Sequence, residues 1–286
     1  MEHVLQVKNL TKHYSEFTLD HVDFSLPKGS IMGFIGENGA GKTTTIKLLL
    51  NLIKRDAGEI NVFGLDNTRC DRQIKEQLGV VLDGSYFHDN LKPYDISRIM
   101  RNIFAGWDND AFAGYIKKFK LPQDKRIKEY SKGMKAKLSI AAALAHRPKL
   151  LILDEATGGL DPVVRNEILD IFMEFIQDEE HSVLMSTHIT SDLERIADYI
   201  TFIHEGKMIF SSSKDELIYD YGLLRCGAED FKNISPSDIA GYRKGQFGYE
   251  ILIRGKAKML QKYRRHTIDA ASIEDIMLFH IRSDDR

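Results

Sequence analysis

The stretch "GENGAGKTTT", residues 36–45, decides the fold of this 286-residue chain. It follows a short apolar run, "IMGFI" (31–35), and leads into a helical pattern that begins at Thr43. Glycines let backbone N–H groups turn inward toward a phosphate, and the N-terminus of the next helix favours an anion. Lys42 supplies a positive charge for the β- and γ-phosphates, and Thr43 supplies a hydroxyl for Mg²⁺. This strand, loop and helix predict a phosphate-binding loop.

The composition is that of a globular protein, with 43% hydrophobic and 29% charged residues and a formal net charge of -2. Such a small charge gives no global indication of a nucleic-acid or anionic-lipid partner. The two cysteines, Cys70 and Cys226, form no CxxC motif, which argues against a disulfide framework and fits a reducing cytosol. With no secretion signal and no apolar run near 18 residues, we expect the chain not to span a membrane by itself.

The pattern of apolar residues predicts an α/β layer fold. Four short continuous apolar runs are typical of strands buried on both faces of a mainly parallel sheet: "IMGFIG" (31–36), "LLIL" (150–153), "SVLMS" (182–186) and "YITFI" (199–203). Between them lie amphipathic helical patterns such as 163–177, which Asp161 and Pro162 open as N-cap and first helical residue. The first 25 residues instead alternate apolar and polar side chains, which favours an antiparallel sheet.

The pattern of predicted elements changes after about residue 211. "SSSKDEL" (211–217) is typical of a loop with a helix start, and "AGYRKGQFGYEILIRG" (240–255) predicts a hairpin around Lys244 and Gly245. "AKMLQKYRR" (257–265) and "SIEDIMLFHI" (272–281) predict helices. We therefore predict a small α+β appendage at 220–286. It contains no catalytic motif, so we expect a regulatory or dimer-stabilising role.

The second motif is "LLILDEATGGLDP" (150–162), an apolar strand that ends in Asp154 and Glu155. In open α/β sheets, sites lie beyond the carboxyl ends of the strands, where both carboxylates would be. Asp154 is suited to hold Mg²⁺, and Glu155 to polarise a water for in-line attack on the γ-phosphate. The alternative is a charged pair that only caps the strand.

Two further motifs follow the same logic. In "YSKGM" (130–134), Ser131 and Gly133 open a strongly helical run and form a second anion site, unless they only cap a core helix. Two anion sites are puzzling for one nucleotide unless this one meets a nucleotide held by another subunit. "LMSTH" (184–188) is a strand expected beside 150–154, so that His188 reaches the γ-phosphate; a structural histidine is the alternative.

These four elements, in this order, resemble the nucleotide-binding domain of ABC transporters over about residues 3–215. The resemblance implies a P-loop NTPase fold, with "GENGAGKT" as Walker A, "YSKGM" as the signature motif, "LLILDE" as Walker B and "GGLD" (158–161) as the D-loop. It implies ATP and Mg²⁺ as cofactors and a head-to-tail dimer that closes on two ATP molecules. Each ATP would lie between Walker A of one subunit and the signature of the other.

The resemblance also assigns site residues. Glu155 and His188 are catalytic, and Thr43, Asp83 and Asp154 serve the metal. Nucleotide contacts are expected from Tyr14, which would stack on adenine, and from Gly36, Asn38, Gly39, Ala40, Gly41, Lys42, Thr43, Thr44, Ser131 and Gly133. A surface residue of a hairpin is the alternative for Tyr14.

Asp83 is the main departure from the family pattern. It follows the strand "LGVVL" (78–82), where the family has the Q-loop glutamine. An ionised aspartate is shorter and offers only hydrogen-bond acceptors. We expect it to act through the metal or a metal-bound water, whereas a turn cap at Gly84 is the alternative. Lys132 also adds a charge to the signature motif, while Ala156 and Gly158 replace a common proline and serine.

The resemblance implies a nucleotide-binding domain over 1–219, with a helical subdomain at about 84–145 and the accessory domain at 220–286. The aromatic-rich segment 85–96 is expected to contact a membrane subunit, unless it is plain helical core. The short insert, the appendage and "SKGM" resemble ATPases of ABC-2 type exporters, and Asp83 resembles the subgroup that exports peptide toxins and antimicrobial peptides, phenol-soluble modulin exporters among them.

This placement implies a cytoplasmic protein, peripheral on the inner face of the cell membrane through a separate ABC-2 type transmembrane subunit. The ATPase partner would be a second copy or a related ATPase, and no nucleic acid is expected. The rival class is a soluble ABC ATPase that acts on nucleic acid or the ribosome. A P-loop kinase is disfavoured by Ser131, Gly133 and His188 together.

Overall fold

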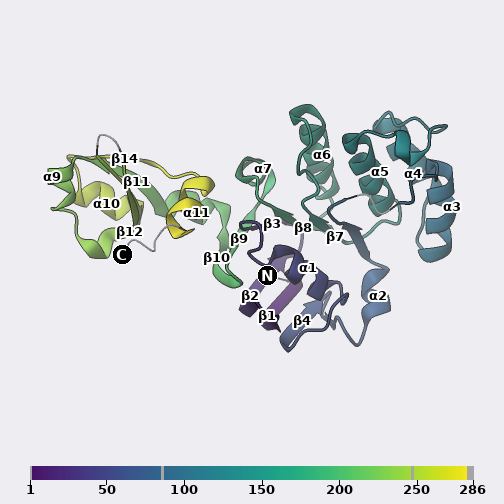
Figure 1. Cartoon of the computed structure of the whole chain (residues 1–286), viewed down its shortest axis with the longest axis horizontal. Helices are drawn as coiled ribbons and strands as arrows, with labels where there is room; N and C mark the ends of the chain where they lie inside the picture. Colours follow the sequence, from purple (N-terminus) through teal and green to yellow (C-terminus); the bar gives the residue numbers. More distant parts are fainter. Residues whose placement is uncertain (1, 85–86, 246–247, 282–286) are drawn as a thin grey trace. The chain divides into compact units, whose positions relative to one another are not determined.

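The computed structural model describes residues 2–84, 87–245 and 248–281. The chain forms two compact units, Met1–Met208 and Ile209–Arg286, and each is described by itself (Figure 1). The division lies earlier than the predicted boundary between 219 and 220. Helix α8 (Lys214–Asp220) packs against strand β11 (Tyr221–Cys226) and helix α10 (Lys256–Lys262) of the second unit, which explains the difference.

A six-stranded sheet forms the centre of the first unit, in the order β10-β9-β3-β8-β7-β6. Its strands are β3 (Ile31–Ile35), β6 (Leu78–Val81), β7 (Leu150–Asp154), β8 (Ser182–Thr187), β9 (Tyr199–His204) and β10 (Lys207–Ser213). β3 pairs in parallel with β8 and β9, and β7 pairs in parallel with β6 and β8. The prediction that the four apolar runs form a buried parallel sheet is therefore confirmed.

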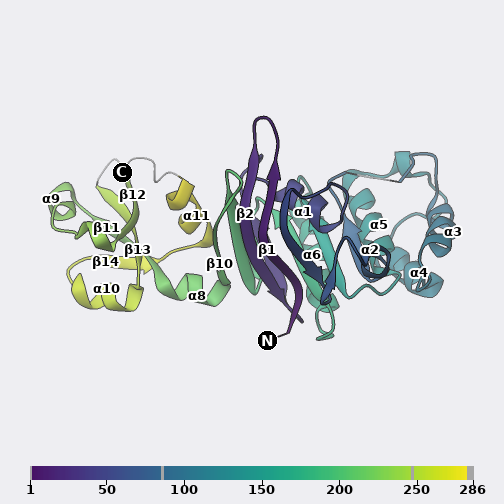
Figure 2. The ribbon, with the colours of Figure 1, turned by 90° about the horizontal axis from the view of Figure 1, so that it is seen from below.

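A second sheet, in the order β2-β1-β4-β5, covers one side of this unit (Figure 2). It contains β1 (His3–His13), β2 (Thr18–Pro27), β4 (Ala57–Val62) and β5 (Leu65–Asp66). All its pairings are antiparallel, as the alternating pattern of the first 25 residues predicts. Its inward side chains, such as Leu5 and Leu10, share one core with Phe34 and Ile46.

Seven α-helices belong to the described part of the first unit. They are α1 (Lys42–Leu49), α2 (Asp71–Lys75), α3 (Pro93–Ile103), α4 (Asn109–Lys118), α5 (Lys132–Leu144), α6 (Pro162–Phe175) and α7 (Thr190–Ile196). The N-cap predicted at Asp161 is confirmed, because its carboxylate accepts the N–H groups of Val163 at 3.1 Å and Val164 at 3.0 Å. Helices α3, α4 and α5 pack on one another as a helical group. Throughout the described ranges, no helix has the length and apolar character needed to cross a bilayer.

The second unit is an α+β fold, as predicted. Its antiparallel sheet has the order β12-β13-β11-β14. The elements are β11 (Tyr221–Cys226), β12 (Ile239–Lys244), β13 (Tyr249–Arg254), β14 (Thr267–Ala270), α8, α9 (Ala228–Phe231), α10 (Lys256–Lys262) and α11 (Ile273–Ile281). The predicted hairpin is confirmed, although residues 246–247 of its turn lie outside the described residues. The loop predicted at 211–213 is wrong, because these serines end β10 and Ser213 then caps α8.

Candidate functional site

The glycine loop lies between β3 and α1, at the carboxyl end of the central sheet. A Cβ on Gly36 would lie only 2.4 Å from the carbonyl oxygen of Ile203, so the neighbouring strand leaves no room for a side chain. Gly39 and Gly41 have φ angles of 85° and 113°, in the region that L side chains rarely adopt. The loop is therefore a backbone cradle of the kind that binds phosphate.

Lys42 is the first residue of α1, and its side chain is only 6% exposed. Its Nζ donates to the carbonyl oxygens of Gly36 at 2.6 Å and Glu37 at 3.1 Å. The same ammonium lies 3.4 Å from Oε1 of Glu155. A buried positive charge is thus held at the mouth of the cradle, next to one carboxylate.

An oxygen cluster surrounds the buried carboxylate of Asp154, the last residue of β7. The Thr43 hydroxyl donates to its Oδ2 at 2.9 Å, and the Ser186 hydroxyl donates to its Oδ1 at 2.8 Å. Hydroxyl and carboxylate oxygens are the ligands that Mg²⁺ prefers, with phosphate and water at its other positions. No group of three or more His, Cys, Asp or Glu side chains arranged to hold a metal occurs among the described residues. A Mg²⁺ site here would therefore need a bound phosphate.

Sequence reasoning missed Ser186. It ends the apolar run "SVLMS" and looks like a strand residue. Its role becomes visible only because β7 and β8 pair in parallel with Asp154 opposite Ser186. The pairing places the hydroxyl against the carboxylate, a contact that orients a metal ligand.

Glu155 follows directly, with a φ of 51° that is rare for a residue with a side chain. Its N–H donates to the carbonyl oxygen of Ser186 at 3.0 Å, which holds the turned backbone in place. Its Oε2 lies 2.7 Å from Nδ1 of His188. Its Oε1 is buried without a hydrogen bond, because the Lys42 ammonium at 3.4 Å is close but not aligned. One carboxylate oxygen is therefore oriented by His188 while the other remains able to accept from water.

Comparisons with known proteins agree with this geometry. Residues 19–158 match the family model for ABC transporters. The bacitracin transport ATP-binding protein BcrA of Enterococcus faecalis is 34% identical over 76% of this chain and 71% of its own length. The lantibiotic transport ATP-binding protein SrtF of Streptococcus pyogenes is 37% identical over 74% of this chain and 92% of its own. The chain belongs to the ABC transporter ATP-binding proteins.

A solved structure of the ATP-binding subunit of an ABC transporter gives the same result in three dimensions. It superimposes with a TM-score of 0.67 and 26% identity, over 75% of this chain and 91% of that chain. The predicted ABC ATPase fold is thereby confirmed.

Ser131 and Gly133, the predicted signature residues, lie at the start of helix α5 in the helical group. Ser131 is exposed and caps α5, where its hydroxyl accepts the N–H of Met134 at 3.2 Å. A Cβ on Gly133 would lie 3.1 Å from the Val164 side chain, so this position is tight as well. No hydrogen bond or ion pair joins Ser131 or Gly133 to residues 36–44 within the described part of the chain.

Asp83 and Lys132, two departures from the family pattern, line one small pocket of about 80 Å³. Lys135 and Glu155 line it as well. A Cβ on Gly159 would lie 2.7 Å from the Lys132 Nζ, so this ammonium lies against the D-loop. Opposite charges thus line one pocket beside Glu155, although Asp83 and Lys132 are 49 positions apart in the sequence (132 − 83).

Tyr14 lies in the turn between β1 and β2, with 46% of its surface exposed. Its ring centroid is 6.4 Å from that of Phe17, and the Lys12 ammonium lies 5.7 Å from its centre. Phe17 in turn lies 3.0 Å from the position of a Cβ on Gly41. Phe17 therefore brings this turn next to the glycine loop, and Tyr14 remains partly exposed.

Sequence reasoning also missed a buried contact behind the site. The Thr157 hydroxyl, just after Walker B, donates to Oδ2 of Asp192 on α7 at 2.8 Å. Burial raises the pKa of Asp192, and the Thr157 hydrogen bond and the charges of Arg165 and Arg195 lower it in part. The contact links the residue just before the D-loop to the helix that follows His188.

Ser186→Ala tests the oxygen cluster. Loss of the hydroxyl leaves Oδ1 of the buried Asp154 without its donor, so we expect the Mg²⁺ concentration for half-maximal binding of a fluorescent ATP analogue to rise about tenfold. Ser182→Ala is the matched control, because Ser182 is buried in the same strand and its hydroxyl accepts from Gly29 instead. An unchanged Mg²⁺ requirement in Ser186→Ala would remove Ser186 from the site.

Proposed function

We propose that this chain hydrolyses ATP with Mg²⁺ at a head-to-tail dimer interface and thereby drives export through a separate transmembrane subunit. The observation that carries the proposal is the convergence of five side chains at the carboxyl end of the central sheet: Lys42, Thr43, Asp154, Glu155 and His188. They come from α1, β7 and the residues that follow β7 and β8.

The described residues fit ATP and Mg²⁺. The backbone of the glycine loop would face the phosphates without intervening side chains. Side chains are excluded at Gly36 and disfavoured at Gly39 and Gly41. Asn38, Ala40 and Thr44 belong to the same loop and helix start. Thr43 and Asp154 would hold the metal, which supplies positive charge to the β- and γ-phosphate oxygens. Lys42 would exchange its carbonyl partners for phosphate oxygens.

Glu155 is proposed as the general base. Its buried Oε1 has no hydrogen-bond partner, so it is able to accept a proton from an attacking water. His188 holds Oε2 and fixes the direction of the carboxylate. The Lys42 ammonium lies 3.4 Å from Oε1, so the carboxylate is held between an ammonium and an imidazole.

The dimer is proposed because the chain has two anion sites. Walker A and the Ser131–Gly133 helix start lie on different elements, with no hydrogen bond between them in the described residues. A second copy, or a related ATPase, turned head to tail would bring each signature to the other Walker A. Each nucleotide would then be held from both sides, with Tyr14 stacked on adenine.

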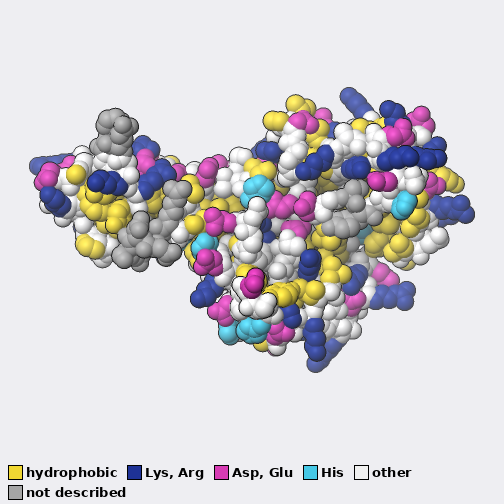
Figure 3. Space-filling model, in the orientation of Figure 1, with side chains coloured by type: hydrophobic (Ala, Val, Ile, Leu, Met, Phe, Trp, Pro, Cys, Tyr) yellow, Lys and Arg dark blue, Asp and Glu magenta, His cyan; other side chains and the backbone are white. Residues whose placement is uncertain are grey.

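The export partner is proposed to bind the helical group. Helix α3 buries Ile96 and exposes Tyr94, Ile99 and Ile103 on its outside. Lys and Arg side chains gather over α3–α5 in Figure 3. Aromatic side chains and Arg are enriched at protein interfaces whereas Lys is depleted, so the exposed apolar side chains of α3 carry this proposal. Of the predicted contact segment 85–96, residues 85–86 lie outside the described residues.

Peptides and antimicrobials are the proposed cargo, and an ABC-2 type membrane protein is the proposed partner. The named relatives support the cargo class, since BcrA is a bacitracin and SrtF a lantibiotic transport protein. The proposed location is the cytoplasmic side of the cell membrane. The soluble ABC ATPase acting on nucleic acid or the ribosome gains no support from these relatives.

Glu155→Gln tests the catalytic assignment. The amide keeps the size of the side chain but is a far weaker base, so turnover should fall about 10²-fold while ATP still binds. The measurement is phosphate release beside nucleotide binding in the purified protein. In cells, the same variant should lose peptide export. Near-normal turnover would contradict the role of Glu155.

Ser131→Arg tests the head-to-tail arrangement. The bulky side chain should block the partner's nucleotide and prevent ATP-dependent closure, yet leave ATP affinity of the monomer unchanged. Lys42→Ala should instead weaken binding in the monomer, because it removes a phosphate contact. Equal losses of monomer affinity in both variants would show that Ser131 acts within its own subunit.

Asp83→Asn tests the proposed action of Asp83 through the metal. It keeps the shape and removes the charge, so the half-saturating Mg²⁺ concentration for turnover should rise, while metal-free ATP binding is unchanged or stronger. Asp110→Asn is the control, since Asp110 is exposed in the first turn of α4 and does not line that pocket. The same Mg²⁺ dependence in Asp83→Asn and wild type would favour a turn cap.

A further inference from the structure

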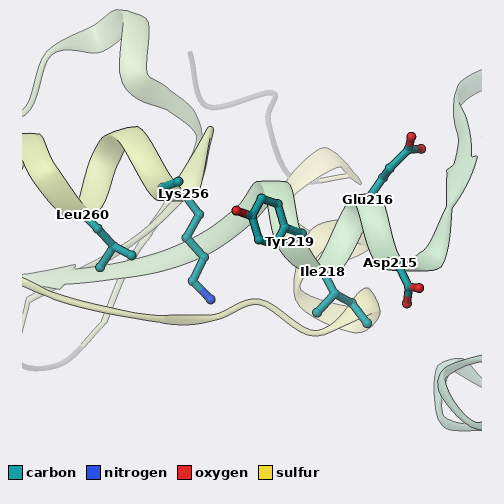
Figure 4. A pocket seen from close by; sticks show the side chains of 7 residues that line it. Asp215, Glu216, Ile218, Tyr219, Lys256 and Leu260 are labelled. Carbon is teal, nitrogen blue, oxygen red and sulfur yellow. The ribbon is translucent and has the colours of Figure 1, made fainter.

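A groove of about 720 Å³ lies on the second unit, between helices α8 and α10. Its lining residues are Asp215, Glu216, Ile218, Tyr219, Lys256, Ala257 and Leu260 (Figure 4). Asp215, Ile218 and Tyr219 have the i, i+3, i+4 spacing of one helix face, and Lys256 and Leu260 have i, i+4 spacing. The groove is thus formed by one face of each helix, with none of the residues assigned to ATP.

The centre of the groove is apolar and exposed. Tyr219 is 76% exposed, Leu260 47% and Ile218 37%. The Tyr219 ring points along the groove toward Lys256 (Figure 4). Grouped exposed side chains of this size mark an interaction surface more often than single ones do.

Opposite charges flank this centre. Lys256 and Asp215 point to the same side in Figure 4, with Ile218 and Tyr219 between them. Among the described residues, neither Lys256 nor Asp215 has an ion pair or a side-chain hydrogen bond. Glu216 points away and is already used, since it accepts from Ser212 and Ser213 at the start of α8.

We propose that this groove is a self-association surface whose occupant is the same groove on a second copy of the chain. A two-fold axis through the Ile218 and Tyr219 region would place each Lys256 opposite the partner's Asp215. The apolar centres would then cover each other. A surface with one charge of each sign on either side of an apolar centre is self-complementary under this symmetry. A partner of a single charge would leave one of the two charges unpaired.

This contact is independent of the proposed ATP-dependent closure, because its residues lie in the other unit. Seven lining residues are fewer than the roughly 20–30 per side of a standard interface, so we expect a weak dimer with a micromolar Kd. Such a dimer would keep two ATPase units at a high effective concentration between rounds of hydrolysis.

A charge-exchange experiment tests the proposal in the full-length chain without nucleotide or Mg²⁺. Sedimentation equilibrium from about 1 to 100 µM should show a concentration-dependent dimer of the wild type. Lys256→Glu and Asp215→Lys should each raise the Kd at least about tenfold through like-charge contacts. The double variant should return to within about threefold of wild type. Tyr219→Ser should also weaken the dimer, and its position at the surface keeps the fold intact.

Lys258→Glu is the matched control, because Lys258 is exposed on α10 but does not line the groove. Its Kd should equal that of the wild type. The proposal is overturned if the nucleotide-free chain stays monomeric at 100 µM, or if the double variant is no better than the single ones. Failure of Glu155→Gln or Ser131→Arg to behave as expected would bear on the proposed function and leave this result untouched.

Discussion

The rest of the structure depends on the buried carboxylate of Asp154. Both of its oxygens receive a hydroxyl hydrogen bond, from Thr43 on α1 and from Ser186 on β8. The carboxylate therefore joins the helix after the glycine loop to two adjacent strands of the parallel sheet. A buried charge that lost either donor would be costly, and this cost holds the three elements in register. The register in turn places Glu155 between Lys42 and His188.

Oppositely charged side chains lie near each other in the site. Lys42 lies beside Glu155, and Asp83 shares a pocket with Lys132. The aspartate in the Q-loop position is therefore accompanied by a lysine in the signature position, and both face the end of Walker B. A negative charge near phosphate groups is unfavourable, so a nearby ammonium offsets part of its repulsion. The two departures from the family pattern have a joint physical explanation.

The proposed roles assign chemistry to one unit and association to the other. All residues assigned to ATP lie in Met1–Met208, whereas Ile209–Arg286 has an antiparallel sheet and a groove with no catalytic group. The proposed dimer closure on ATP would use the first unit and would be reversed by hydrolysis. Association through the second unit would persist in every nucleotide state.

The sequence by itself determined the fold class and predicted most residues of the candidate site. Continuous apolar runs specify a parallel sheet, because strands buried on both faces exclude polar side chains, and the glycine loop fits only a strand followed by a helix. Local signals also located the Asp161 cap and the hairpin of the second unit. Each of these rests on residues that are neighbours in the chain.

Only the tertiary structure decided which distant residues meet. Ser186 supports Asp154 because two strands pair in parallel, and Lys132 reaches the pocket of Asp83 because α5 packs against the sheet. The boundary between the units lies at 208/209 rather than at the predicted 219/220, since α8 packs on β11 and α10. Pairing register and packing are properties of contacts across the fold, and no local pattern of residues records them.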